Sequence, residues 1–146
     1  MRLRIHHFFD IIRDIGKGIE FEPHPYGHSN HIVARKIRDG EVSEIELVMG
    51  CDDICERCVH KVNGHCDDAI HHKGFSGKEE YNNFLDSRIM EVCGLHEHDI
   101  LMPCELLARG MLYAGKMEWI YSVNDPEHTA GRKMDFLKGL KILPEK

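Results

Sequence analysis

The sequence predicts a mainly helical α+β fold, with about five helices and a short strand and hairpin near a cysteine-rich loop. Three observations support this fold class. Apolar residues recur at helical spacing along most of the chain, one short run is rich in β-branched residues, and Asn63-Gly64 is a strong hairpin signal. We find no internal repeat and no low-complexity linker, so we expect a single metal-binding domain over residues 1–146.

Two helices are expected in the first part of the chain. The first covers residues 5–15 and ends at the glycines that follow. Its apolar stripe at helical spacing consists of Ile5, Phe8, Phe9, Ile12 and Ile15. A loop over residues 24–28 contains proline and glycine, which disfavour regular structure. Ser29 or Asn30 then caps a second helix that runs to about residue 38.

The middle of the chain is expected to hold one strand, the hairpin and one long helix. Residues 44–49 are the best strand candidate because they are rich in branched side chains and partly alternate. Ser76 and Glu79 have the spacing of a capping box and predict a helix that runs to Cys93. The apolar stripe of this helix consists of Tyr81, Phe84, Leu85, Ile89 and Val92.

Two further helices complete the expected fold. Pro103 begins one of them. Its core candidates are Leu106, Leu107, Met111, Leu112 and Trp119. Asp125 as N-cap and Pro126 in the first helical position predict the last helix. Its core candidates are Met134, Phe136, Leu137 and Leu140.

Charge and composition narrow the class of protein. The chain has 19 basic and 25 acidic residues and a net charge of −6, which argues against binding nucleic acid because phosphate recognition needs a basic surface. No apolar run reaches the roughly 18 residues that a membrane span requires, and the N-terminal stretch is too polar for a secretory signal. We therefore expect a cytoplasmic protein whose six cysteines are kept reduced.

Four cysteines form the strongest signal in the sequence. Cys51, Cys55, Cys58 and Cys66 have the spacing C-x3-C-x2-C-x7-C. In a reducing compartment such a group indicates metal binding before it indicates disulfides. The Asn63-Gly64 turn is expected to fold Cys66 back beside Cys58, so that the thiolates can converge on one centre.

The identity of the centre is open at this point. Four thiolates suit an iron–sulfur cluster, for which a [4Fe-4S]-type centre is our first expectation. Zinc is the alternative, and His60 or His65 could then replace a thiol. A redox-active Cys55–Cys58 pair is a third hypothesis, although the expected strand-then-helix placement is missing.

The two remaining cysteines, Cys93 and Cys104, each stand alone beside a helix end. We interpret both as buried core residues. Cys104 as a remote ligand of the centre is the alternative.

Histidines and acidic residues form a second group of candidates. His6 and Asp10 stand one helical turn apart, a spacing that lets an imidazole and a carboxylate meet. Such a pair could ligate a metal, transfer protons or form a polar network, and the alternative is a solvated helix face. The candidate catalytic residues are His6, Asp10 and His28, and Asp10 is also a possible metal ligand. Four more residues are candidates for holding the ligands of the centre in place without binding the metal themselves. These are His7, Arg13, Asp52 and Asp53.

Short motifs carry a family resemblance over roughly the first half of the chain. R-x-R-x-H-H at residues 2–7, Gly16-Lys17-Gly18 and D-D-I-C at residues 52–55 resemble an uncharacterised prokaryotic family of small cysteine-rich proteins. That family is a domain of unknown function suspected of holding an iron–sulfur cluster. Many relatives have a cysteine in place of Asp10 and no counterpart of Cys51, which implies that Asp10 lies near the centre and that Cys51 compensates. Relatives also carry late cysteines that this chain lacks.

The favoured function is therefore a protein that uses an iron–sulfur centre for electron transfer or small-substrate chemistry. Its partner would be a redox protein or a small molecule. The alternative is a zinc-stabilised structural or adaptor domain without catalysis. The resemblance supplies no reaction, so whether the chain is an enzyme is open.

Overall fold

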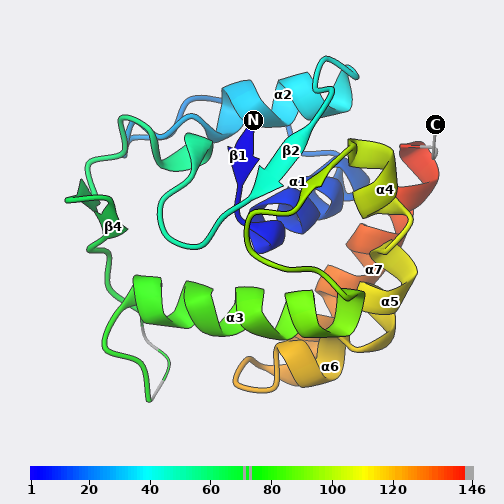
Figure 1. Ribbon diagram of the computed structural model, residues 1–146. Coiled ribbons are helices and arrows are strands. Elements are labelled where there is room, and N and C mark those ends of the chain that lie inside the picture. The colour runs from blue at the N-terminus through cyan, green and yellow to red at the C-terminus, as the bar shows by residue number, and fades with distance from the viewer. Residues whose placement is uncertain (71, 73, 144–146) are drawn as a thin grey trace.

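The computed structural model describes residues 1–70, 72 and 74–143, and it confirms a mainly helical α+β fold (Figure 1). The elements in chain order are β1 Arg2–Leu3, α1 Ile5–Lys17, α2 Asn30–Arg38, β2 Ile45–Leu47, the 3-10 turn η1 Asp53–Cys55, β3 Lys61–Val62, β4 His65–Cys66, α3 Lys78–Cys93, β5 Ile100–Leu101, α4 Pro103–Leu107, α5 Gly110–Gly115, α6 Met117–Ile120 and α7 Pro126–Ile142. No helix in the described part of the chain is long and apolar enough to cross a bilayer.

Two small sheets hold the strands. In the first, β2 lies in the middle, parallel to β1 and antiparallel to β5. The second is the predicted hairpin of β3 and β4, in which Asn63 and Gly64 take positive φ angles of 51° and 79°. The expected pairing of Cys66 with Cys58 is wrong, because the register sets Cys66 opposite Lys61. Cys58 lies in the turn before β3, where its carbonyl oxygen accepts a hydrogen bond from the Lys61 N–H.

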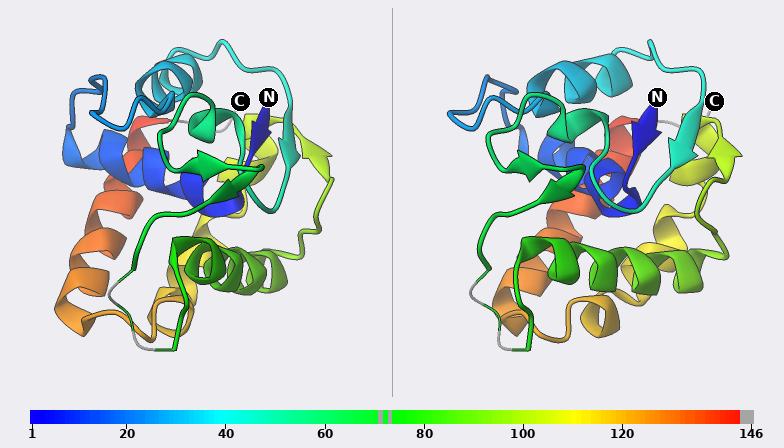
Figure 2. Two further views of the ribbon diagram at one scale, coloured as in Figure 1. Left: turned by 90° about the vertical axis from the view of Figure 1, so that its left-hand side faces the viewer. Right: turned by 60° about the vertical axis from the view of Figure 1, so that its left-hand side comes forward.

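The helices surround α1 and the three-stranded sheet. Figure 1 shows α3 along the lower side of the molecule and α2 along the upper side, with α1 and the sheet between them. In both views of Figure 2, the loop that carries η1, β3 and β4 lies beside α1. Phe9 of α1 is fully buried and packs against Tyr113 and Phe136, with ring centroids 4.4 and 5.5 Å away. The core therefore joins the two ends of the chain.

Glycines allow α1 and α7 to pack backbone to backbone. A Cβ atom at Gly139 would lie 1.9 Å from the carbonyl oxygen of Ile12, and one at Gly16 would lie 1.8 Å from that of Asp135. Both positions thus require glycine for close approach rather than for a special φ angle. The contact fixes α1, which carries several candidate site residues, against the C-terminal helix.

The prediction of one continuous helix from Pro103 is wrong, and so is part of its predicted core face. The chain breaks into three short helices, α4, α5 and α6, and each break rotates the buried face. Leu106 and Leu107 are buried as expected, but further along the segment Tyr113, Met117 and Ile120 fill the core. The side chains expected in the core but exposed are Met111 (66%), Leu112 (54%), Trp119 (42%) and, on α7, Met134 (62%).

The start of α3 also differs from the expected capping box. Ser76 lies one residue before the N-cap and bonds Glu80 rather than Glu79, with an Oγ–Oε2 distance of 2.6 Å. Glu79 instead turns inward and accepts a hydrogen bond from Arg4 at 2.9 Å. The expected capping box is therefore wrong, and the N-cap residue of α3 is Gly77, which provides no side-chain cap.

Candidate metal centre

A cleft of about 350 Å³ lies between α1, the cysteine loop and the start of α3. We call it the cysteine cleft. The site residues proposed from the sequence that line it are His7, Asp10, Arg13, His28, Cys55, Cys58, His60 and Cys66. Residues far apart in the sequence are thus brought to one place, as the metal-centre hypothesis requires.

The thiols of the cysteine loop are free and partly buried. Burial and the neighbouring charge of Asp52 both raise the pKa of Cys55, whose Sγ lies 3.5 Å from an Asp52 oxygen. Burial also raises the pKa values of Cys51 and Cys66. A reactive redox thiol requires the opposite shift, so the surroundings of Cys55 disfavour the hypothesis of a redox-active Cys55–Cys58 pair.

Asp52 joins the cysteine loop to α1. Its Oδ1 accepts hydrogen bonds from the N–H groups of Ile54 (3.1 Å) and Cys55 (3.4 Å), so it caps η1. Its Oδ2 lies 2.7 Å from both the Arg4 N–H and His7 Nδ1. Burial alone would raise the pKa of Asp52, but the charge of His7 and these hydrogen bonds outweigh it and lower the pKa to about 2. The carboxylate stays ionised and holds both segments.

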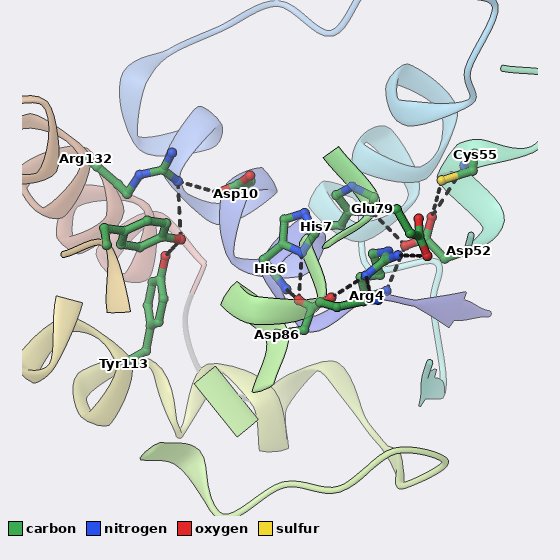
Figure 3. A network of polar contacts seen from close by, with 12 residues as sticks. Arg4, His6, His7, Asp10, Asp52, Cys55, Glu79, Asp86, Tyr113 and Arg132 are labelled. Atoms are coloured by element: carbon green, nitrogen blue, oxygen red, sulfur yellow. Dashed lines mark hydrogen bonds and ion pairs between the residues drawn. The ribbon is translucent and has the colours of Figure 1, made fainter. Parts of the chain in front are cut away.

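His6 does not line the cleft, because it turns inward to a buried ion-pair network (Figure 3). Its Nδ1 lies 2.7 Å from Asp86 Oδ1, and Arg4 donates to Asp86 Oδ2 at 2.9 Å. Asp86 and the Arg4 side chain are 0% and 1% exposed. Burial would raise the pKa of Asp86, yet His6 and Arg4 hold it below its usual range. The expected meeting of His6 with Asp10 does not occur.

Asp10 lines the cleft, but its carboxylate already forms ion pairs with two arginines. Arg132 of α7 donates to its Oδ1 at 2.5 Å (Figure 3). Arg13 Nη1 lies 3.6 Å from the same oxygen. Burial would raise the pKa of Asp10, but Arg132 and Arg13 outweigh it and lower the pKa. Behind this pair, the hydroxyls of Tyr121 and Tyr113 are 2.6 Å apart in the core.

Four aromatic rings form the opposite wall of the cleft. His24 and His28 stack at 4.5 Å, and Tyr26 packs edge-on against His24 and His60. The Nδ1 atoms of His24 and His28 accept backbone N–H groups from Tyr26 (3.1 Å) and Asn30 (3.4 Å). Burial and the neighbouring His24 lower the pKa of His28, which favours its neutral form.

Other candidates lie outside the cleft. Asp53 is half-buried and accepts the Arg2 N–H at 2.9 Å, and His65 is 73% exposed. Cys51 borders Cys55 but does not line the cleft. No three His, Cys, Asp or Glu side chains among the described residues are already arranged to hold a metal ion.

The two isolated cysteines are also apart from the cleft. Cys93 is buried, as expected. Cys104 is only half-buried and lines a different cavity, beside α2 and the end of α7.

Sequence reasoning missed the buried partners Arg4 and Asp86 and the partly buried Arg132. One signal could have revealed Asp86. Asn82, Asp86, Ile89 and Cys93 recur at helical spacing, and all four are buried. Polar members of such a stripe require partners from elsewhere in the fold.

Comparison with known families places this geometry in context. A family model described as "Protein of unknown function (DUF1284)" matches residues 26–123, about two thirds of the chain. The chain belongs to the DUF1284 family. The DUF1284 match contains D-D-I-C and all four cysteines of the loop, whereas the R-x-R-x-H-H motif and α1 precede it. Searches among curated proteins and among solved structures give no match.

Proposed function

We propose that this DUF1284 protein holds a [4Fe-4S]-type iron–sulfur centre in its cysteine loop. The observation that carries the proposal is that Cys55, Cys58 and Cys66 are free thiols that line a single cleft. Cys55 and Cys58 precede the hairpin, and Cys66 lies in its second strand, β4. Cys51, next to Cys55, is the fourth candidate from the sequence. Thiolates are the ligands that such clusters require.

The donor chemistry fits an iron centre. Burial and Asp52 disfavour a bare thiolate at Cys55. A bound cation reverses this preference, because its positive charge stabilises the deprotonated ligand. The thiols are not yet arranged around one point in the described part of the chain, so binding requires the loop to rearrange, and the cleft of about 350 Å³ offers the space for a centre.

The rest of the cleft supports chemistry on a small molecule. His7, Asp10, Arg13 and His28 offer hydrogen-bonding and charged groups beside the thiols. Such convergent polar groups around a cleft are typical of small-ligand sites. We therefore favour small-substrate chemistry over electron transfer to a redox partner. We also propose a cytoplasmic location, where six free thiols remain reduced.

Zinc is the second candidate. His60 lines the same cleft as Cys58 and Cys66, and its Nδ1 is held by Asp67 at 2.8 Å. A mixed set of thiolates and imidazole is a common structural zinc site. In that case the metal would only stabilise the loop.

Anaerobic purification followed by analysis of iron, acid-labile sulfide and zinc tests the proposal. We expect brown protein with equal iron and sulfide and with broad visible absorbance that dithionite bleaches. Cys55→Ser should lose the iron. Cys104→Ser is the matched control, because its thiol is also half-buried but lines another cavity, and it should keep the iron.

Colourless protein with stoichiometric zinc and no sulfide would overturn the iron–sulfur proposal and support the structural zinc site. His60→Ala then identifies the zinc ligand, because loss of zinc is expected only if the imidazole binds it.

A further inference from the structure

The four cysteines of the loop do not all line the cysteine cleft. Cys55, Cys58 and Cys66 line it, whereas Cys51 does not. The backbone N–H of Cys51 donates to the Gly64 carbonyl oxygen at 3.4 Å, so this residue belongs to the base of the hairpin. A centre that occupies the cleft therefore finds three thiols around it and needs a fourth ligand from another residue.

His7 presents a prepared nitrogen ligand on the α1 side of this cleft. Its Nδ1 lies 2.7 Å from Asp52 Oδ2, and the ionised carboxylate can only accept, so Nδ1 is the protonated nitrogen. Nε2 lies across the ring. Burial would lower the pKa of His7, but Asp52 outweighs it and raises the pKa, so a metal ion has to displace the Nε2 proton while Asp52 keeps the proton on Nδ1. Asp52 is itself fixed by the N–H groups of Arg4 and Ile54, which fixes the imidazole in turn. Histidines that ligate metals usually donate their second ring nitrogen to a carboxylate in this way.

The other side chains on the cleft wall are less suited to ligation. His24 and His28 accept backbone N–H groups at Nδ1, so their protons are on Nε2, the nitrogen that would have to bind. His60 has a carboxylate on each side, Asp67 at 2.8 Å from Nδ1 and Asp68 at 3.7 Å from Nε2. In Asp10, Oδ1 is already shared by two arginines.

We propose that His7 ligates the centre through Nε2, together with Cys55, Cys58 and Cys66, and that Cys51 is not a ligand. This inference rests on the proposed iron–sulfur function. It assigns Asp52 the role of positioning His7. Replacing a thiolate with an imidazole raises the reduction potential of an iron–sulfur centre, so the centre should be easier to reduce than one held by four cysteines.

Pulsed EPR of the dithionite-reduced, anaerobically purified protein tests the ligand set without any substitution. Protein grown with 15N-labelled histidine should show a strong nitrogen hyperfine coupling that changes with the isotope. His7→Ala should abolish this coupling, and His28→Ala, from the same cleft, should retain it. Cys51→Ser should keep the iron, the sulfide and the EPR spectrum of the unaltered protein.

Different outcomes overturn the two proposals. An iron–sulfur spectrum without histidine nitrogen coupling, lost in Cys51→Ser, would establish a four-cysteine centre and refute the role of His7. Retained coupling in His7→Ala, with circular dichroism showing a folded protein, would likewise refute it. Unaltered protein that contains neither iron nor sulfide would refute the proposed function itself.

Discussion

Replacing Gly139 with alanine should destabilise the fold, although alanine is the better helix former. The new methyl carbon would lie 1.9 Å from the Ile12 carbonyl oxygen and 2.8 Å from the Ile12 carbonyl carbon. These are backbone atoms of α1, so no side-chain rotation relieves the overlap. The two helices must separate by more than an ångström, which loosens the core around Phe9 and Phe136.

The magnitude follows from two opposed effects. Overpacking a well-filled core costs about 1–3 kcal/mol. Alanine in a helix interior gains up to about 1 kcal/mol over glycine. The overlap here is with backbone, so we expect the upper part of the first range and a net loss of about 2 kcal/mol.

Gly131→Ala is the matched control for this change. Gly131 lies in the same helix and is exposed, and a methyl group added there would meet no atom within 4 Å. The substitution should be stabilising by up to about 1 kcal/mol. Urea unfolding followed by far-ultraviolet circular dichroism gives both free energies. Equal midpoints for the two variants would refute the claim that α1 and α7 meet backbone to backbone at Gly139.

Three further predictions concern charge and metal. Asp86→Ala leaves Arg4 buried without its main partner and should cost about 3–5 kcal/mol in urea unfolding, whereas Glu79→Gln, at a position 20% exposed, should cost clearly less. Because the Arg132 pair lowers the folded-state pKa of Asp10, its stabilisation is present above an unfolded-state pKa of about 4 and is lost as the pH falls below it. Asp10→Asn should therefore reduce the loss of stability between neutral and acidic pH, and an unchanged pH profile would contradict this. Oxidative removal of iron should lower the thermal midpoint of the anaerobic protein, since a ligand bound only by the folded state stabilises it.

The sequence revealed the elements whose signals are local. The helix that begins at Pro126 carries its cap, Asp125, within its own segment, and Asn63-Gly64 sets its own turn. The helix that begins at Asn30 was predictable from its periodicity, but the expected Ser29 cap is wrong, because the Ser29 hydroxyl donates to the Glu56 carbonyl oxygen instead. The strands β1 and β5 contain two residues each. No two-residue run can show an alternating pattern, so these strands depend on β2 as a template.

The sequence alone predicted many of the residues that form the site, but not which of them form ion pairs with one another. The cysteine loop and its acidic cap are contiguous, so their role could be inferred from spacing. The ion pairs of Arg4 with Asp86 and of Asp10 with Arg132 join residues 82 and 122 positions apart. Only the tertiary fold decides which carboxylate meets which cation, and this is why helical spacing alone favours His6 over His7 as the catalytic candidate.

Asp52 explains why the N-terminal histidine motif and D-D-I-C occur together in this chain. One carboxylate binds the backbone of Arg4, the imidazole of His7 and two N–H groups of η1. It therefore couples α1, which lies outside the matched DUF1284 region, to the loop inside it.

Asp52→Asn tests this coupling, because the amide can accept on one side only and must present N–H groups to the donors on the other. Unsatisfied buried partners of this kind cost about 1–3 kcal/mol. Asp53→Asn is the natural comparison, since the Asp53 side chain is half-buried and accepts a single hydrogen bond, from the Arg2 N–H. Amide hydrogen exchange should show lost protection only in Asp52→Asn, at Arg4 if the amide turns its NH2 group toward α1, or at Ile54 if it turns this group toward η1. Equal protection in the two variants would mean that the loop keeps its shape without the carboxylate, and the positioning of His7 by Asp52 would have to be abandoned.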